Sequence, residues 1–311
     1  MKYFYLQWTD KRPSQCYFTD QLPESINYHQ LINIKGFTDI FETINVCGYF
    51  SEDFKPYHCE NPVYKNRSYL LSHLQKSIRK MSCDKSVKTA KHLLDINPNY
   101  LLRRIPILMF EDVIPHESLS IIVWLMMATS KGFVLKKEMM EWILGVIYFL
   151  STCKFHDEYK KIDTINTELI KINYGILQDT FLRACLIRVA YGGMKGDMKM
   201  INYCIELWVK RFKEGKSINN EKIHSIKISI DKLKRNEWDL SAIDFHCNHR
   251  LIPDIKQQYE LYSEEYIKIL IWKYSSRLNK RIQYTKDNEE YKDWLIIKKY
   301  VRWLQSNMLS N

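Results

Sequence analysis

Apolar side chains recur every three or four residues through most of the chain after residue 67, which is the spacing of one face of an α-helix. The stretch 68–80 shows the pattern clearly. Leu70, Leu71, Leu74 and Ile78 fall on one face, while basic and amide side chains fall beside or opposite it. This stretch is therefore predicted to form an amphipathic helix whose apolar side meets a core.

Start and stop signals place the helices that follow. Asp84 is a suitable N-cap for a helix that runs to about residue 96. Pro98 suits the start of a helix over 99–110, which Pro106 is expected to kink. Residues 191–198 are expected to form a tight loop, and 241–253 an irregular turn. The other expected helices cover 118–130, 136–150, one or two parts of 163–190, 199–213, 223–235, 259–280 and 288–308.

The first 62 residues differ from the rest, because they hold half of the eight prolines together with many aromatic residues. We expect a short strand over 2–8 and a strand or short helix over 31–44. The predicted fold is thus mostly α, a multi-helix bundle with a small irregular N-terminal arm that contains a little β structure. The expected division is an arm over 1–62, a core helical domain over 63–214 and a C-terminal helical region over 215–311 packed on the core, with 213–220 as an exposed linker.

Composition favours an intracellular protein. None of the eight cysteines forms a C-x-x-C pair, and the N-terminus does not resemble a signal peptide. The longest apolar runs, over 121–128 and 142–150, are too short to cross a membrane. We expect a cytoplasmic or nuclear protein, not a secreted one, with no membrane partner. Abundant Lys, Ile, Asn and Tyr also suit an AT-rich genome, such as that of a large DNA virus.

Positive charge is concentrated in one stretch. Residues 65–104 hold ten Lys or Arg against two acids, which leaves +8 of the chain's net +11. Charge on this scale attracts polyanions, so we expect DNA or RNA backbone as the partner. The residues predicted to contact phosphate are Lys76, Arg79, Lys80, Lys85, Lys88, Arg103 and Arg104.

Each of these residues has a structural alternative. Arg103 and Arg104 precede Glu111 and Asp112 by about two helical turns, so they could form ion pairs between neighbouring helices instead of phosphate contacts. The lysines could form an ordinary solvated face.

The same stretch carries a family resemblance. It has a Lys76-Ser77-Ile78-Arg79 step, then the pair Arg103-Arg104, then Glu111-Asp112-Val113 after a six-residue gap. This order resembles the C-terminal helical region of the RarA/MgsA-type AAA+ ATPases, which belong to the clamp-loader clade and act at stalled replication forks. The resemblance covers about residues 65–155, under a third of the chain.

The resemblance implies a helical collar that self-associates and contacts DNA or replication proteins. It does not imply ATP hydrolysis, because the chain has no G-x-x-x-x-G-K-[ST] motif and no acidic Walker B strand. The ATPase module that precedes the collar in the family is therefore not expected here.

Two other segments are weighed as sites. The segment from Asp244 to His249 offers metal-ligand types, but no second ligand pair is visible, and residues 58 and 59 could supply one only by chance folding. A packed turn is therefore the preferred interpretation, and no metal is assigned. The loop with Gly192, Gly193 and Lys195 could cradle an anion, although a helix C-cap and tight turn explain both glycines. The interleaved C-terminal aromatics could stack on bases, but core packing is preferred.

The sequence thus predicts a non-enzymatic nucleic-acid-binding accessory protein of DNA replication or repair, without cofactors and as a homo-oligomer or with replication proteins as partners. The alternative is a structural or interaction protein, for example a viral virion or replication-factory component, that docks an acidic partner. A third interpretation is an enzyme that uses the segment from Asp244 to His249.

Overall fold

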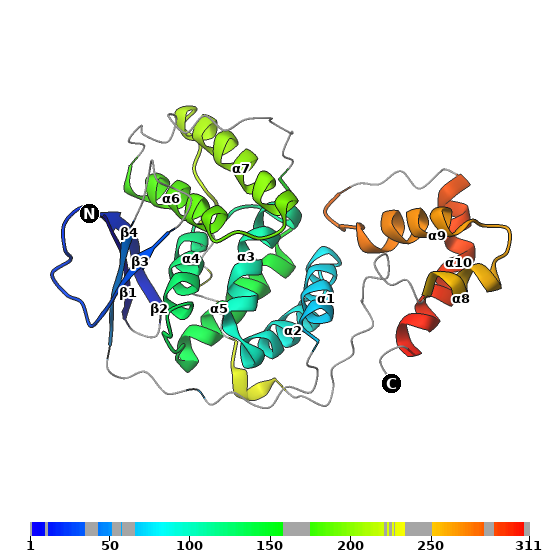
Figure 1. Cartoon of the computed structure of the whole chain (residues 1–311), viewed down its shortest axis with the longest axis horizontal. Coiled ribbons are helices and arrows are strands. Elements are labelled where there is room, and N and C mark those ends of the chain that lie inside the picture. Colours follow the sequence, from blue (N-terminus) through cyan, green and yellow to red (C-terminus); the bar gives the residue numbers. More distant parts are fainter. Residues whose placement is uncertain are drawn as a thin grey trace.

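Figure 1 shows a body made of a sheet and helices, with a further group of helices beside it at the C-terminal end. The structure is a computed structural model. It describes residues 2–9, 12–34, 43–51, 57, 66–157, 175–220, 223, 226, 228–233, 251–282 and 289–307. The mostly helical fold expected from the sequence is confirmed.

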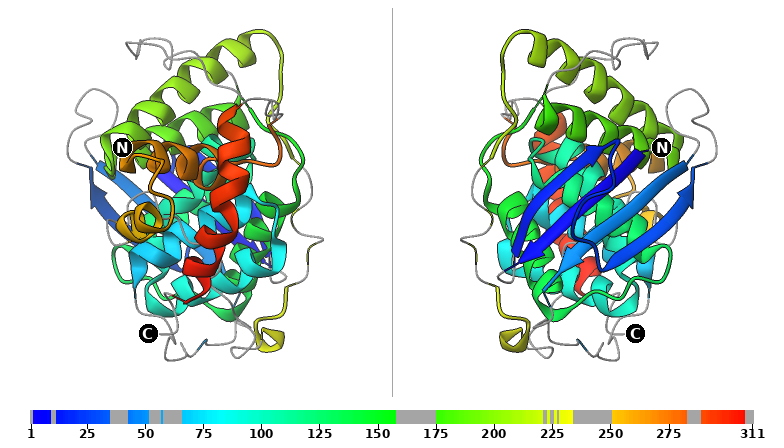
Figure 2. Two further views of the ribbon diagram at one scale, coloured as in Figure 1. Left: turned by 90° about the vertical axis from the view of Figure 1, so that its right-hand side faces the viewer. Right: turned by 90° about the vertical axis from the view of Figure 1, so that its left-hand side faces the viewer.

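The N-terminal region forms a four-stranded mixed sheet, which is more regular than the arm expected from its prolines. Its strands are β1 (Lys2–Thr9), β2 (Arg12–Thr19), β3 (Tyr28–Asn33) and β4 (Thr43–Phe50), in the order β2-β1-β4-β3. β1 runs parallel to β4, and the other pairs are antiparallel. The strand expected over 2–8 is confirmed. Figure 2 shows the sheet covering one side of the helices.

Alternation of apolar and polar residues explains how this sheet packs. Phe4, Leu6 and Trp8 lie on one face of β1 and are fully buried. The indole Nε1 of Trp124 donates hydrogen bonds to the carbonyls of Phe4, at 2.9 Å, and of Cys47, at 3.0 Å. The sheet is therefore joined to the helical body by a buried polar contact as well as by apolar area.

The helices of the body match most of the expected ranges. Pro106 lies inside the third helix, and two strongly apolar helices, α4 and α5, occupy the core as expected. The helices are α1 (Arg67–Arg79), α2 (Cys83–Ile96), α3 (Pro98–Asp112), α4 (Ser118–Thr129), α5 (Lys137–Thr152), α6 (Ile176–Ala190) and α7 (Lys195–Lys213).

The C-terminal helices have a hydrophobic cluster of their own, separate from the one that joins the sheet to α1–α7. They are α8 (Leu251–Gln258), α9 (Glu264–Ile271) and α10 (Glu289–Asn307), with a π-helical turn at Trp272–Ser276. Tyr274 and Trp294 are buried in this cluster, as the preference for core packing predicts, but Trp272 and Trp303 are exposed.

Four local expectations were wrong. The helix expected over 259–280 is broken, because Ser263 caps a new helix, α9, with its hydroxyl accepting from the Tyr266 N–H at 3.1 Å. Helix α8 begins at Leu251, inside the expected turn 241–253. Helix α7 begins at Lys195, inside the expected loop 191–198. The N-cap of α2 is Ser82, and Asp84 lies in its first turn.

The basic helix expected over 223–235 was also wrong for the residues that the structure describes there. Ile223 and Ile230–Lys232 have 3-10 conformation, and none of the described residues there is α-helical. Ile223 and Ile226 pack near Gly145 of α5, where a side chain at residue 145 would come within 3.6 Å of either. Irregular backbone here places isoleucines along α5, which outweighs the helical spacing of the sequence.

Within the part of the chain that the structure describes, no helix is both long and apolar enough to cross a membrane.

Candidate functional site

The basic stretch predicted from the sequence is largely turned inward. Lys76 is 5% exposed and Arg79 is 9% exposed, so most of each side chain lies inside the protein. Lys91, in the same stretch, is also buried and forms an ion pair with Asp95 at 2.6 Å. Burial of a cation requires a partner within the protein. Lys91 has its partner on its own helix, whereas the carboxylates that pair with Arg79 come from α3.

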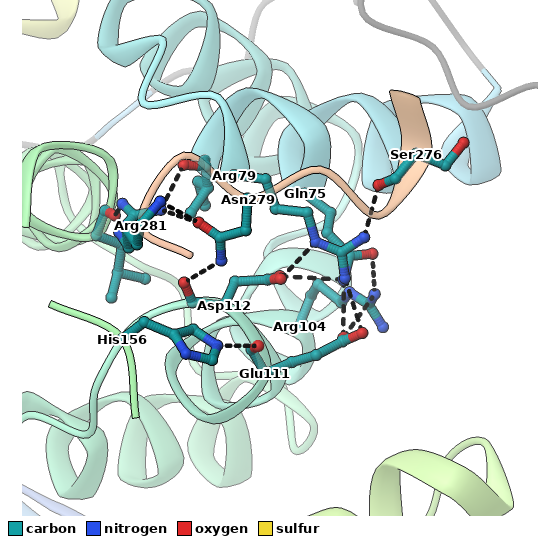
Figure 3. A network of polar contacts seen from close by, with 11 residues as sticks. Gln75, Arg79, Arg104, Glu111, Asp112, His156, Ser276, Asn279 and Arg281 are labelled. Atoms are coloured by element: carbon teal, nitrogen blue, oxygen red, sulfur yellow. Dashed lines mark hydrogen bonds and ion pairs between the residues drawn. The ribbon is translucent and has the colours of Figure 1, made fainter. Parts of the chain in front are cut away.

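Arg79 is the centre of a polar network that joins three parts of the chain (Figure 3). Its Nε pairs with Asp112 and its Nη2 with Glu111, the latter at 2.8 Å, while Nη1 donates to the carbonyl of Ser276 at 2.8 Å. Gln75 donates to both carboxylates, at 2.7 and 3.1 Å. Burial raises the pKa of Asp112, and the Arg79 guanidinium opposes that rise.

Arg104 belongs to the same network. Its Nη2 donates to Gln75 Oε1 at 2.6 Å and lies 3.9 Å from Glu111, and its Nη1 pairs with Asp197 of α7 at 3.3 Å. These contacts match the structural alternative for Arg104, an ion pair between helices, because α1, α3 and α7 meet at this side chain.

Arg103 points to main-chain oxygens instead of carboxylates. Its Nη2 donates to the carbonyls of Tyr191, at 2.7 Å, and Gly192, at 3.1 Å. Arg188 donates to the Gly192 carbonyl at 2.9 Å and, through Nε, to the Arg103 carbonyl at 2.9 Å. Burial, followed by the charge of Arg103, lowers the pKa of Arg188 to about 10.

In the loop that was considered as an anion site, the carbonyl of Gly192 therefore accepts hydrogen bonds from Arg103 and Arg188. Gly192 has φ +70° and Gly193 has φ +157°, conformations that favour glycine. Lys195 follows as the exposed first residue of α7. The structure brings Arg103 to this loop, and the sequence pattern did not pair the two.

The other three predicted residues lie at the α1–α2 turn. Lys80 is the C-cap of α1, and Lys85 and Lys88 stand on α2; all three are half-buried. Lys88 forms an ion pair with Asp84 at 3.0 Å. These lysines are the part of the predicted phosphate-binding set that reaches the surface.

Sequence reasoning missed a second basic segment that lies against this turn. The Lys280 N–H donates to the Arg79 carbonyl at 2.9 Å, and Arg281 donates to the carbonyl of Ile78, also at 2.9 Å. These are end carbonyls of α1, which lack helical partners. Arg281 further donates to the carbonyls of Leu150, at 2.5 Å, and Cys153, at 2.7 Å.

These contacts create what we call the junction surface, formed by Lys80, Trp272, Arg277 and Lys280. Arg277 and Lys280 are exposed, and Trp272 is 43% exposed. The Arg277 guanidinium lies 4.9 Å from the centre of the Trp272 ring. Three cations and an aromatic face thus gather from segments about two hundred residues apart in the sequence.

The remaining sequence predictions stay open. The segment from Asp244 to His249, and residues 58 and 59, lie outside the described residues. Among the residues that are described, no group of three or more His, Cys, Asp or Glu is placed to hold a metal ion. Comparisons with models of protein families, with curated proteins and with solved structures found no match, so the collar resemblance stays a prediction.

Proposed function

We propose that this protein is a nucleic-acid-binding accessory protein of DNA replication or repair, without a catalytic step of its own, that contacts the phosphate backbone at the junction surface. The observation that carries the proposal is the placing of Lys280 directly against the end of α1. This contact adds Arg277 and Lys280 to the basic α1–α2 turn.

Charge and chemistry both support this use of the surface. α1, α2 and the turn between them together hold seven Lys or Arg against two Asp, and the lysines at the turn reach solvent. Clustered cations bind polyanions by releasing condensed counterions, which needs no base-specific contact. Trp272 offers a face on which an unpaired base can stack.

The test is a titration of binding to labelled duplex DNA, single-stranded DNA and RNA across salt concentrations. Lys80→Ala/Arg277→Ala/Lys280→Ala is compared with Lys131→Ala/Lys199→Ala/Lys213→Ala, which removes three exposed positive charges elsewhere. We expect the junction variant alone to lose at least tenfold in affinity. Its slope of log affinity against log salt should also fall, by about 0.9 for each lost duplex contact.

Two outcomes would count against the proposal: equal losses in both variants, or affinity that does not depend on salt. Trp272→Ala refines the test. Because stacking needs unpaired bases, this variant should weaken binding to single strands and leave duplex binding nearly unchanged.

The second candidate function, docking of an acidic protein partner, is favoured by the exposed face of α10. Leu295, Ile296 and Trp303 are 47%, 53% and 57% exposed, and Lys299 and Arg302 are exposed beside them. An acidic amphipathic helix would complement such a face. If nucleic acid fails to bind at low salt, capture of a partner that depends on Trp303 and Lys299 becomes the preferred function.

A further inference from the structure

A cavity of about 690 Å³ lies next to strand β2, and none of the residues of the junction surface lines it. Its walls come from strand β2, the first turns of α4 and α6, Trp142 of α5, and Ser217, Ile218, Asn220 and Ile223. This volume lies within the range of small-molecule sites, which are concave, mostly apolar and fitted with a few polar groups.

The apolar part of the wall is aromatic and aliphatic. Trp142 and Phe181 contribute rings from α5 and α6, and Ile121 and Leu177 contribute branched side chains. Trp142 and Phe181 are almost fully buried, whereas Leu177 is 67% exposed. The two aromatic rings are therefore held in place by the surrounding core. A ligand that enters past Leu177 would cover exposed apolar surface.

Two polar groups on α4 lack partners of their own. Ser120 is only 5% exposed and lines the cavity, yet its hydroxyl has no hydrogen-bond partner among the described residues. Glu117 stands one turn earlier on the same helix face, and its carboxylate has no ion pair within the described part of the chain. Glu117 is exposed at the mouth of this wall, and partial desolvation of its carboxyl raises the pKa of that group.

The charge of the lining is unusual for this protein. Among the described residues that line the cavity, Glu117 alone has a formal charge, although the chain carries net +11. His116 accepts the Ser118 N–H at its Nδ1, at 3.0 Å, which fits a neutral ring. Burial raises the pKa of Cys16 well above its ordinary value and keeps that thiol neutral.

The start of α4 offers little to an anion. The N–H groups of Ser118, Leu119 and Ser120 already donate to His116 and Glu117 within the first turn. The carboxylate of Glu117 is therefore the dominant electrostatic feature of this wall.

We propose that this cavity binds a small organic ammonium ion, with its apolar body between Trp142 and Phe181, its cationic nitrogen at Glu117 and a hydrogen bond to Ser120. A carboxylate beside aromatic rings suits an ammonium group both by charge and by cation–π attraction. This proposal does not rest on the phosphate-binding one, because the described lining of the cavity contains no Lys or Arg.

The probes are phenethylamine, phenethyl alcohol and phenylpropionate, which carry the same ring on a cationic, a neutral and an anionic chain. Their affinities are measured by calorimetry at pH 7 for the wild type, Glu117→Gln and Glu24→Gln, the last being a remote exposed carboxylate that serves as the control. We expect the amine to bind at least tenfold tighter than the anion in the wild type and in Glu24→Gln. That preference should vanish in Glu117→Gln.

Ser120→Leu adds a second readout. Its larger side chain projects into the cavity and should abolish binding of all three probes, while circular dichroism checks that the fold persists. Equal affinity for the three probes, or an amine preference that survives Glu117→Gln, overturns the proposal. Binding that survives Ser120→Leu in the folded protein places the probes elsewhere and overturns it as well.

Discussion

At the scale of single residues, the buried Arg79–Asp112 pair gives one of the predicted phosphate-binding residues a structural role. Asp112 is 1% exposed and Arg79 is 9% exposed, so neither charge is solvated by water to any extent. Each makes the burial of the other tolerable. Glu111 and the Ser276 carbonyl accept from the remaining Arg79 donors, and Gln75 donates to Asp112. Arg79 is therefore expected to stabilise the fold and to hold the junction surface in shape.

We predict that Asp112→Asn lowers the free energy of unfolding by about 3 kcal/mol, because it leaves the Arg79 cation buried without its closest counter-charge. The control is Asp84→Asn, which breaks the ion pair with Lys88; Asp84 is 71% exposed, so the loss should stay below about 0.5 kcal/mol. Urea denaturation measures both. The double variant Arg79→Met/Asp112→Leu should recover most of the loss, and a deeper loss there would contradict the explanation.

At the scale of elements, the boundary between α2 and α3 was predictable from the sequence. Asn97 separates α2 from α3, and its side chain accepts the Asn99 N–H at 2.9 Å while Pro98 occupies the first turn. Prediction failed where a helical period had no such boundary, as over 223–235, or where a cap at Ser263 lay inside a continuous period. Caps thus fix these boundaries more strictly than periodicity does.

We predict that Asn97→Ala costs about 1 kcal/mol of unfolding free energy, since one first-turn N–H of α3 loses its acceptor. Asn97→Asp keeps an acceptor oxygen and should cost only a few tenths of that amount. Chemical denaturation of the two variants side by side checks the prediction. A similar loss in both would mean that Asn97 acts through packing and not through capping.

The candidate site was only partly predictable from the sequence, because contacts between distant segments decide which cations reach the surface. The sequence reveals that charge is concentrated over 65–104, and it names Glu111 and Asp112 as possible partners. It cannot reveal that Asp197 meets Arg104, or that Arg281 caps α1, because such contacts depend on how distant helices pack. Which cations reach solvent is therefore decided by tertiary structure, and the junction surface has no local sequence signal.

At the scale of the whole molecule, the C-terminal helices meet the body through the segment 276–282. Their own cluster is apolar, but the described contacts of this segment with the body are mainly polar (Figure 3). Asn279 is 2% exposed, and its amide donates to the Asp112 carbonyl at 2.8 Å and accepts the Arg281 N–H at 3.1 Å. The hydrogen bonds of Asn279 therefore hold Lys280 beside Lys80, although Asn279 is neutral and is not part of the junction surface.

A substitution at Asn279 can therefore change the geometry of the junction surface without changing its charge. Asn279→Ala removes no charge, but it takes the amide from Asp112 and from Arg281, so the segment 276–282 should open more often. We expect faster hydrogen exchange at the Lys280 N–H and a several-fold loss of nucleic-acid affinity at constant salt dependence, whereas Asn33→Ala, at an exposed position of β3, changes neither. Faster exchange with unchanged affinity would show that Lys80 and Lys280 do not bind phosphate as one surface, because their separation would then carry no cost.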